Sequence, residues 1–440
     1  MEILIKAGQL ILSLSILIIF HEFGHFVFAK LFKTRVEKFY LFFDPWFSLF
    51  KIKWGETEYG IGWLPLGGYV KISGMIDESM DKEQLKKPPQ PWEFRSKPAW
   101  QRLLIMLGGV LVNFILAFAI YVMILFVWGK EYLPTENVKY GIVVDSLGRE
   151  FGLQDGDKIV SVNGKKVEDF RKILSELLLN DPKVIKVERN GELKDVYFTD
   201  EMIGEIIKQK TPFFGVRIPF IVYDFVKDSP AQKAGMQKND KIIAVNGSET
   251  LYFDEFAKKI NEYKDKDVSI TVLRNGKKLD LNVHVTPEGK IGVYPLADFD
   301  RLFDMKKVNY TLAQAIPAGI KMGYDEIGNY LKQFKLVFTP ETKAYESVGG
   351  FIAIGNIFPA EWDWRIFWSM TALLSIMLAV VNILPIPALD GGHVMFLIFE
   401  IVSGRKPSDK FLEYAQIVGM VILFSLLIYA NGNDIIKLFK

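Results

Sequence analysis

The sequence HEFGH at residues 21–25 lies near the end of an apolar stretch that begins at Ile3, and it decides how the whole chain is interpreted. Lys6 is the only charged residue between Ile3 and Phe20. About 20 apolar residues in a helix, at about 1.5 Å rise per residue, cross a bilayer. An ionisable group at membrane depth costs on the order of 3 kcal/mol, so several of them together indicate a functional site.

The spacing within this motif is typical of a metal site. His21 and His25 are four residues apart and share one face of a helix, while Glu22 lies beside them. In this geometry two imidazoles hold a metal ion and the carboxylate reaches its bound water. The motif also arises by chance in soluble helices, but its position inside an apolar span weakens that explanation.

The composition fits a protein with both membrane spans and soluble domains. The chain has 440 residues, of which 50% are hydrophobic and 24% are charged, and its net charge of +2 gives no indication of nucleic-acid binding. The absence of cysteine excludes disulfides and thiolate metal sites, so any metal must be bound by His, Asp or Glu. The first apolar stretch lacks a basic cluster and an A-x-A-like cleavage site, and we therefore expect a retained span.

Three further apolar stretches predict transmembrane helices, at residues 101–128, about 364–384 and about 411–429. Basic residues follow the first span and precede the second and the last, which places these segments in the cytosol and both chain ends outside. In the second span, Gly108, Gly109 and Asn113 are explained by close helix packing, and Asn113 could also line an active cavity. The basic residues concerned are Lys30, Lys33, Arg35, Lys38, Arg95, Lys97, Arg102, Arg405, Lys406 and Lys410.

The segment between the first two spans contains short predicted strands at residues 63–72, separated by glycines. The stretch is too short to span a membrane. It fits either a small hairpin that dips into the protein interior or an ordinary surface hairpin.

An internal repeat follows the second span. Residues 153–164 recur as residues 236–247, and each copy predicts a turn, an alternating strand and an Asn-Gly hairpin followed by a short helix. The two segments that contain these copies, residues 129–219 and 220–300, resemble bacterial PDZ domains. The resemblance is clearest at Ser229-Pro230-Ala231 and weaker at Ser146-Leu147-Gly148 in the first copy.

A PDZ resemblance implies a groove that receives an extended chain or a terminal carboxylate. The candidate carboxylate loops are Phe214-Gly215-Val216 and Ile291-Gly292-Val293. Nothing in the sequence identifies a peptide ligand, so we favour a steric gate over a pair of domains that bind a peptide tail.

His284 alternates with apolar residues in a predicted strand and is interpreted as structural. Residues 311–338 predict an amphipathic helix that rests on the membrane or on the second repeat.

The third span ends in NILPIPALDGGH, residues 382–393. Its prolines must disturb the helix, and Asp390 places another carboxylate among apolar residues. Two histidines and one carboxylate, with water in the fourth position, form a catalytic zinc arrangement. Asp390 and His393 are both candidates for the third ligand, and a carboxylate is favoured because it neutralises part of the metal charge.

Together these motifs resemble the site-2 intramembrane metalloproteases, in the bacterial regulator-of-sigma-E branch, over nearly the whole chain. The resemblance implies one Zn²⁺ per chain, bound by His21, His25 and Asp390, with Glu22 as the catalytic base. It also implies substrate contacts from a membrane-associated β element and from two asparagines. In the second span the family's usual Gly-Pro is Gly109-Val110 here. The implied substrate-binding residues are Gly67, Gly68, Tyr69, Asn113 and Asn382.

We therefore expect a polytopic α-helical membrane protein with four transmembrane helices, membrane-associated β elements and two extracytoplasmic α+β PDZ domains. The resemblance implies cleavage of single-span membrane proteins, such as anti-sigma factors or remnant signal peptides, in a bacterial inner membrane, with the active site near the cytosolic side. A silent scaffold, a metal-dependent enzyme of different chemistry and a metal transporter are the alternatives. The expected segments are 1–30, 31–100, 101–128, 129–219, 220–300, 301–345, 346–400 and 401–440.

Overall fold

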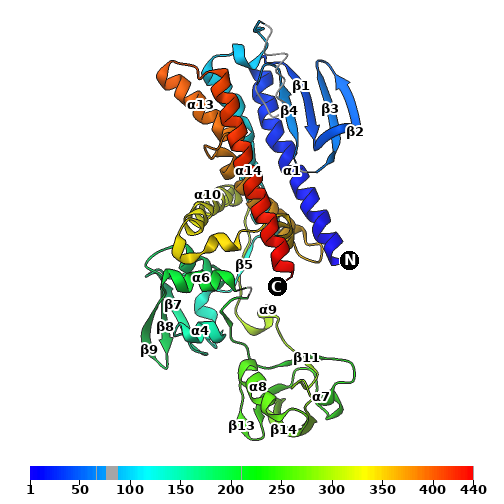
Figure 1. The fold of residues 1–440 in the computed structure, drawn as a ribbon. Coiled ribbons are helices and arrows are strands. Elements are labelled where there is room, and N and C mark those ends of the chain that lie inside the picture. The colour runs from blue at the N-terminus through cyan, green and yellow to red at the C-terminus, as the bar shows by residue number, and fades with distance from the viewer. Residues whose placement is uncertain (66, 76–87, 210, 440) are drawn as a thin grey trace. The chain divides into compact units, whose positions relative to one another are not determined.

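The protein forms two compact units in the computed structural model, which describes residues 1–65, 67–75, 88–209 and 211–439. The first unit comprises Met1–Gly129, Asn309–Phe334 and Tyr345–Lys440, and the second comprises Lys130–Val308 and Lys335–Ala344 (Figure 1). Leu66, which lies in the stretch predicted as a small hairpin, is outside the described residues.

Among the described residues, four helices of the first unit are long and apolar enough to cross a membrane, which confirms the four predicted spans. The fourth runs well beyond the predicted stretch of 411–429 at its C-terminal end, and a shorter helix, α13 (Asp390–Ser403), stands between the third and the fourth. The four are α1 (Glu2–Leu31), α3 (Ala99–Trp128), α12 (Trp364–Ile383) and α14 (Asp409–Leu438).

Small residues bring α1 and α3 into close contact. A side chain at Gly24 would overlap the backbone carbonyl of Gly108, so the two helices meet backbone to backbone at this point. Such approaches are typical of membrane helices, where packing replaces the hydrophobic driving force. The predicted role of Gly108 in helix packing is therefore confirmed.

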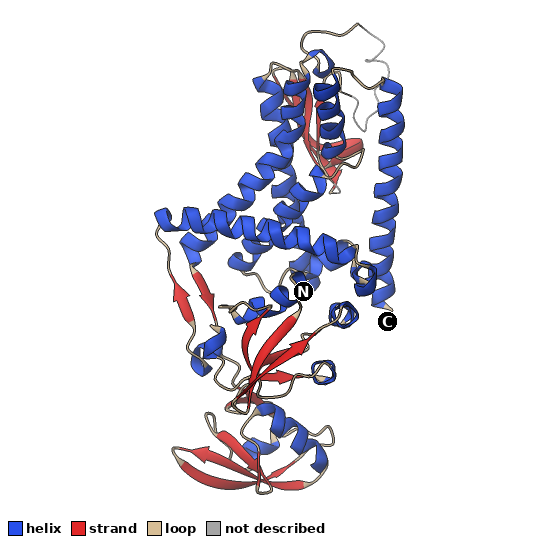
Figure 2. Ribbon diagram, turned by 90° about the vertical axis from the view of Figure 1, so that its left-hand side faces the viewer, coloured by secondary structure: helices blue, strands red, loops and turns tan. Residues whose placement is uncertain are grey.

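Helix α10 (Leu312–Val337) runs crosswise to the long helices of the first unit (Figure 2). Its Gly319 and Gly323 lie directly against Val122 and Phe118 of α3. The apolar stripe predicted for residues 311–338 thus forms a helix, and part of it packs within the protein. Short helices among the described residues of this unit include α11 (Phe351–Asn356) and η1 (Phe94–Ser96), and η6 (Ala344–Ser347) begins at the last residue of the second unit and continues into the first.

A four-stranded sheet follows α1, in the order β2-β3-β1-β4. Strand β1 (Val36–Leu41) is parallel to β3 (Thr57–Leu64) on one side and antiparallel to β4 (Tyr69–Ile72) on the other, while β2 (Phe43–Trp54) forms the far edge. The predicted hairpin of residues 63–72 is therefore wrong, because β3 and β4 do not pair with each other. Pro65 has no N–H group to extend a ladder from β3, and the chain passes to the other side of β1.

The second unit contains two modules that share a core order of elements. In each, a short strand and a helical turn lead into an antiparallel sheet crossed by a helix, and a last strand pairs back with the first. The first module has β6 (Ile142–Val144), α4 (Ser146–Glu150), β7 (Lys158–Val162), η3 (Phe170–Lys172), α5 (Ile173–Leu179), β8 (Val184–Arg189), β9 (Glu192–Tyr197), α6 (Asp200–Lys208) and β10 (Phe214–Val216). The second has β11 (Val222–Phe225), α7 (Pro230–Lys233), β12 (Lys241–Val245), β13 (Ser248–Glu249), α8 (Phe253–Ile260), η4 (Asn261–Tyr263), β14 (Asp267–Arg274), β15 (Lys277–His284) and β16 (Val293–Pro295).

An identical ion pair in both modules supports their equivalence. Arg189 binds both carboxylate oxygens of Asp157 at 2.7 Å and the carbonyl of Gly152 at 2.7 Å. Arg274 repeats these contacts with Asp240 at 2.7 and 2.6 Å and with the carbonyl of Gly235 at 2.8 Å. The repeat detected in the sequence is thus a structural repeat.

The two ends of the second unit's main segment are held together by a two-stranded ribbon. Strand β5 (Lys130–Tyr132) pairs with β17 (Lys306–Val308), and Lys130 lies opposite Val308. This main segment, Lys130–Val308, is therefore an insertion whose entry and exit strands are neighbours. Its remaining short elements are η2 (Thr135–Asn137), α9 (Phe299–Leu302) and η5 (Pro340–Thr342).

Candidate metal centre

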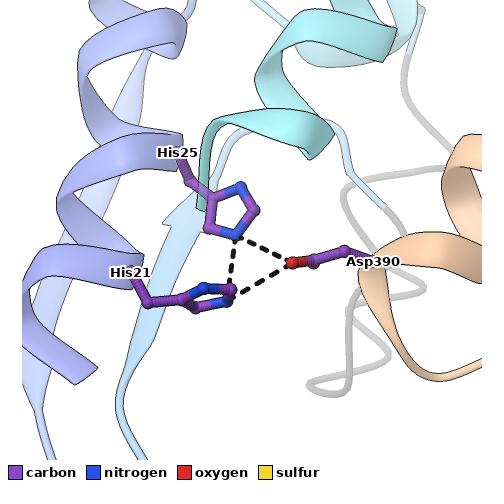
Figure 3. A group of neighbouring side chains, drawn as sticks. All are labelled: His21, His25 and Asp390. Atoms are coloured by element: carbon purple, nitrogen blue, oxygen red, sulfur yellow. Dashed lines mark hydrogen bonds and ion pairs between the residues drawn. The ribbon is translucent and has the colours of Figure 1, made fainter. Parts of the chain in front are cut away.

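His21 and His25 lie one turn apart on α1, and Asp390 is the first residue of α13 (Figure 3). Their side chains converge within the first unit. Nε2 of each histidine is 3.3 Å from Oδ2 of Asp390, and the two Nε2 atoms are 3.4 Å apart. The side chains are only 12%, 9% and 15% exposed, respectively.

These distances fit a tetrahedral metal ion. Zinc binds nitrogen and oxygen at about 2.0–2.1 Å, which places two ligands of a tetrahedron about 3.3–3.4 Å apart. Oδ2 of Asp390 is buried and has no hydrogen-bond donor among the described residues. Three electron-pair donors that face one another in a largely buried place are stabilised by a shared cation. The residues present therefore fit a zinc ion.

The second ring nitrogen of His25 fixes its orientation. Nδ1 lies 2.8 Å from the backbone carbonyl oxygen of Ile105 on α3. A carbonyl can only accept, so Nδ1 carries the proton and donates it, and Nε2 keeps its lone pair toward Asp390. This outer contact is the usual partner of a metal-binding histidine. Sequence reasoning missed this contact, because every residue has a backbone carbonyl and the residue type does not show which one accepts a hydrogen bond.

Gly109 makes room for both imidazoles. A side-chain carbon at this position would lie 2.5 Å from Nε2 of His25 and 2.6 Å from Cε1 of His21. Gly108 contacts Gly24 of α1, and the next residue, Gly109, faces the two imidazoles. The glycine pair thus serves the site as well as the helix packing.

A cavity of about 770 Å³ opens at the three ligand side chains. Glu22 lines it, as the predicted base must. Three of the residues predicted to contact substrate, Gly68, Tyr69 and Asn382, line it as well, whereas Gly67 and Asn113 do not. His393, the other candidate for the third ligand, lines the cavity but is not part of the His21–His25–Asp390 group.

The chain approaches α1 very closely at Gly68, immediately before β4. A side-chain carbon at Gly68 would lie 2.6 Å from the Cγ2 atom of Ile18 and 3.5 Å from the Cγ atom of Glu22. Beyond it, the hydroxyl of Tyr69 donates to Oδ1 of Asp44 at 2.8 Å. Burial and this carboxylate raise the pKa of Tyr69 above its ordinary value, so the hydroxyl stays protonated.

The segment before Asp390 is held tightly. A side chain at Gly391 would overlap the carbonyl oxygens of Leu384 and Ile383, so α13 can start close to the end of α12 only with glycine there. Ala388 has a φ of 79°, which is uncommon for a residue with a side chain. Its N–H donates to Oε1 of Gln416 on α14 at 3.2 Å.

Gln416 was missed by sequence reasoning. Its side chain is buried and lines the cavity. The signal that could have found it is a lone amide in an apolar span, because such a group usually has a partner. A partly buried ion pair was also missed: Arg102 of α3 contacts Glu400 of α13 at 2.5 Å and thereby links these two helices.

The PDZ loop candidates belong to the second unit. The first candidate is not a loop but strand β10, which comprises Phe214, Gly215 and Val216 and pairs with β6. The buried side chain of Phe214 and the hydrogen bonds to β6 keep this segment extended. Ile291 and Gly292 precede β16, and the hydroxyl of Ser229 donates to the carbonyl of Ile291. His284 is exposed, with Nδ1 2.9 Å from Asp267. The carboxylate-binding role stays a prediction.

Four apolar helices and a buried His-His-Asp group beside a glutamate define a polytopic membrane protein with the site of a metallopeptidase. The chain belongs to peptidase family M50, whose family model matches residues 9–426. The resemblance found in the sequence is thus confirmed, and the protein is a peptidase.

Curated relatives align with the chain from end to end. The regulator of sigma E protease of Haemophilus influenzae is 28% identical over 460 residues and is covered completely, as is this chain. Two proteins named "putative zinc metalloprotease" are similarly close. The one from Neisseria meningitidis is 27% identical over 97% of this chain and 98% of its own length, and the one from Rickettsia conorii is 29% identical over 98% of each.

Proposed function

We propose that the protein is an intramembrane zinc metalloprotease that cleaves single-span membrane proteins within or beside their transmembrane segments. The observation that carries this proposal is the tetrahedral spacing of three candidate ligand atoms, two on the membrane-type helix α1 and one on α13, at a cavity that Glu22 also lines. The names of the relatives support zinc and a role in regulated proteolysis.

The chemistry divides between the ion and the chain's own residues. A bound zinc ion would supply Lewis acidity, polarising the scissile carbonyl and lowering the pKa of water to about 7. Glu22 would take the proton of the attacking water and later give it to the leaving amine. Asn382 lies with its Nδ2 3.4 Å from Nε2 of His21, where it would donate to a substrate carbonyl at the site.

A helical substrate hides its peptide bonds, so it must unwind locally before attack. Strand β4 is the edge of its sheet and Gly68 to Ile72 line the cavity, which would let β4 pair with the unwound segment. Lys38 and Lys71 line the same cavity and place positive charge there. Gly67 would shape the turn into β4 without contacting substrate.

The basic segments beside the spans support an inner-membrane topology with the active site near the cytosol and both chain ends outside. The two modules of the second unit would then be extracytoplasmic domains of PDZ type that exclude substrates with bulky outer parts. Membrane-tethered anti-sigma factors and remnant signal peptides are substrates of the required form.

Reconstitution with a single-span substrate in lipid vesicles tests the function. We expect wild type to cleave within or beside the span, and Glu22→Gln to lose cleavage by about a thousandfold or more while it retains one zinc per chain. Removal of the metal with a chelator should abolish cleavage, and zinc should restore it. Full cleavage by Glu22→Gln, or by protein that contains no metal, would exclude the mechanism. Zinc uptake without cleavage of any single-span substrate would favour a transporter.

A further inference from the structure

We propose that Asn113 is a positioning residue of the metal centre, whose side-chain amide holds the imidazole of His21 so that Nε2 faces the other two ligand atoms. The inference rests on zinc binding by His21, His25 and Asp390. It assigns Asn113 a different role from the substrate contact implied by the sequence.

The amide of Asn113 lies at the outer nitrogen of His21. Its Nδ2 is 3.2 Å from Nδ1 of the imidazole, on the side of the ring away from Asp390. The residue is fully buried and does not line the cavity, so substrate cannot reach it. Its Oδ1 is buried without a hydrogen-bond partner among the described residues.

The proton on His21 decides which amide atom faces the ring. Nε2 must present a lone pair to a metal, so Nδ1 carries the proton. Of the two amide atoms, only Oδ1 can accept it. The amide therefore turns so that Oδ1 and Nδ2 exchange places, an exchange that leaves the shape of the side chain unchanged.

Three residues on one face of α3 then serve the ligand pair. Ile105, Gly109 and Asn113 follow one another at intervals of four and so lie in a row along the helix. The carbonyl of Ile105 accepts from His25, Gly109 makes room for both rings, and Asn113 accepts from His21. The four-residue spacing within this row on α3 equals the four-residue spacing of His21 and His25 on α1.

The position of Asn113 is itself fixed. The hydroxyl of Ser375 on α12 donates to its backbone carbonyl oxygen at 2.8 Å, and Ser375 is fully buried. The amide is therefore held between α1 and α12. Because the partner of His25 is a backbone carbonyl, Asn113 is the outer contact that a substitution can remove.

Zinc affinity of the full-length protein in detergent, measured by competition with a chelator, tests the proposal. Asn113→Leu keeps the shape but leaves the Nδ1–H of His21 buried without an acceptor, and we expect the zinc Kd to rise about 10- to 100-fold. Asn113→Asp supplies a carboxylate acceptor and should keep the zinc Kd within about threefold of wild type. Thr371→Val is the matched control, since it removes a buried hydroxyl that contacts Ser13 and no ligand, and it should leave the zinc Kd unchanged.

Cobalt provides a second readout. The visible absorption of the Co²⁺-loaded protein reports ligand geometry, so Asn113→Leu should shift its bands, while Asn113→Asp and Thr371→Val should keep them. An unchanged zinc Kd in Asn113→Leu, in protein whose metal-free thermal unfolding is normal, would overturn the proposal. So would equal losses in the Leu and Asp variants. If Asn113→Leu does not fold, Asn113→Ala takes its place in the same comparison with Asn113→Asp. A wild type that binds no zinc would refute the proposed function itself.

Discussion

At the scale of residues, the group of His21, His25 and Asp390 could be predicted from the sequence, whereas the contacts that support it could not. His21, His25 and Asp390 are ionisable groups in apolar surroundings, where such groups are costly and therefore indicate a functional site. The acceptor for His25 is a backbone carbonyl, which any residue at position 105 supplies. Gln416 carries a visible signal, a buried amide in an apolar helix, but its contact with Ala388 depends on how α14 packs.

Gly109 provides the residue-scale prediction. In Gly109→Ala the new carbon would lie 2.5 Å from Nε2 of His25, and relieving this contact costs about 1–3 kcal/mol of strain or moves the rings. We expect zinc affinity to fall by about tenfold or more, because the ligand atoms can no longer keep their tetrahedral spacing. Zinc competition measures this loss.

The control is Gly8→Ala, since Gly8 lies on the same helix as the histidines and has open space around it. It should bind zinc as wild type does. Normal zinc binding by Gly109→Ala would mean that the rings have more room than the structure provides.

At the scale of elements, helices were predicted better than strand pairing. An apolar run of membrane length specifies a helix on its own, because every backbone hydrogen bond is made within the segment. Strand order depends on partners distant in the chain. The parallel pairing of β1 with β3 and the placement of β4 across β1 therefore could not be deduced from residues 63–72, and neither could the extended state of Phe214–Val216.

The two edges of this sheet allow a prediction about substrate pairing. The chain contains no cysteine, so a single introduced cysteine reports one position. In a Glu22→Gln background, Lys71→Cys on β4 should form a disulfide with a substrate cysteine next to the scissile bond. Lys53→Cys on β2, the opposite edge, is the control and should form little. Cross-linked species are counted on non-reducing gels. Equal yields at both edges would exclude pairing along β4.

At the scale of the whole molecule, the chain separates the chemistry from the modules inserted into it. The three candidate ligands and the cavity belong to the first unit, and the repeat belongs to the second. The repeat was visible in the sequence because its turns need Asn-Gly and because Asp157 and Asp240 occupy equivalent positions in residues 153–164 and 236–247. The ribbon of β5 and β17 was not visible, since each strand has only three residues.

That ribbon makes the insertion separable, which tests the proposed size filter. Lys130 and Val308 are opposite one another, so replacing residues 130–308 by a short glycine linker should leave the first unit closed and its metal site intact. We expect the shortened protein to cleave a substrate with a short outer segment at about the wild-type rate. It should also cleave a substrate with a folded outer domain, which wild type should spare, because the modules no longer restrict access. The rates are compared in vesicles, with zinc content as the control for an intact site. If the shortened protein binds one zinc yet still spares the bulky substrate, selection resides in the first unit, and the modules have another role.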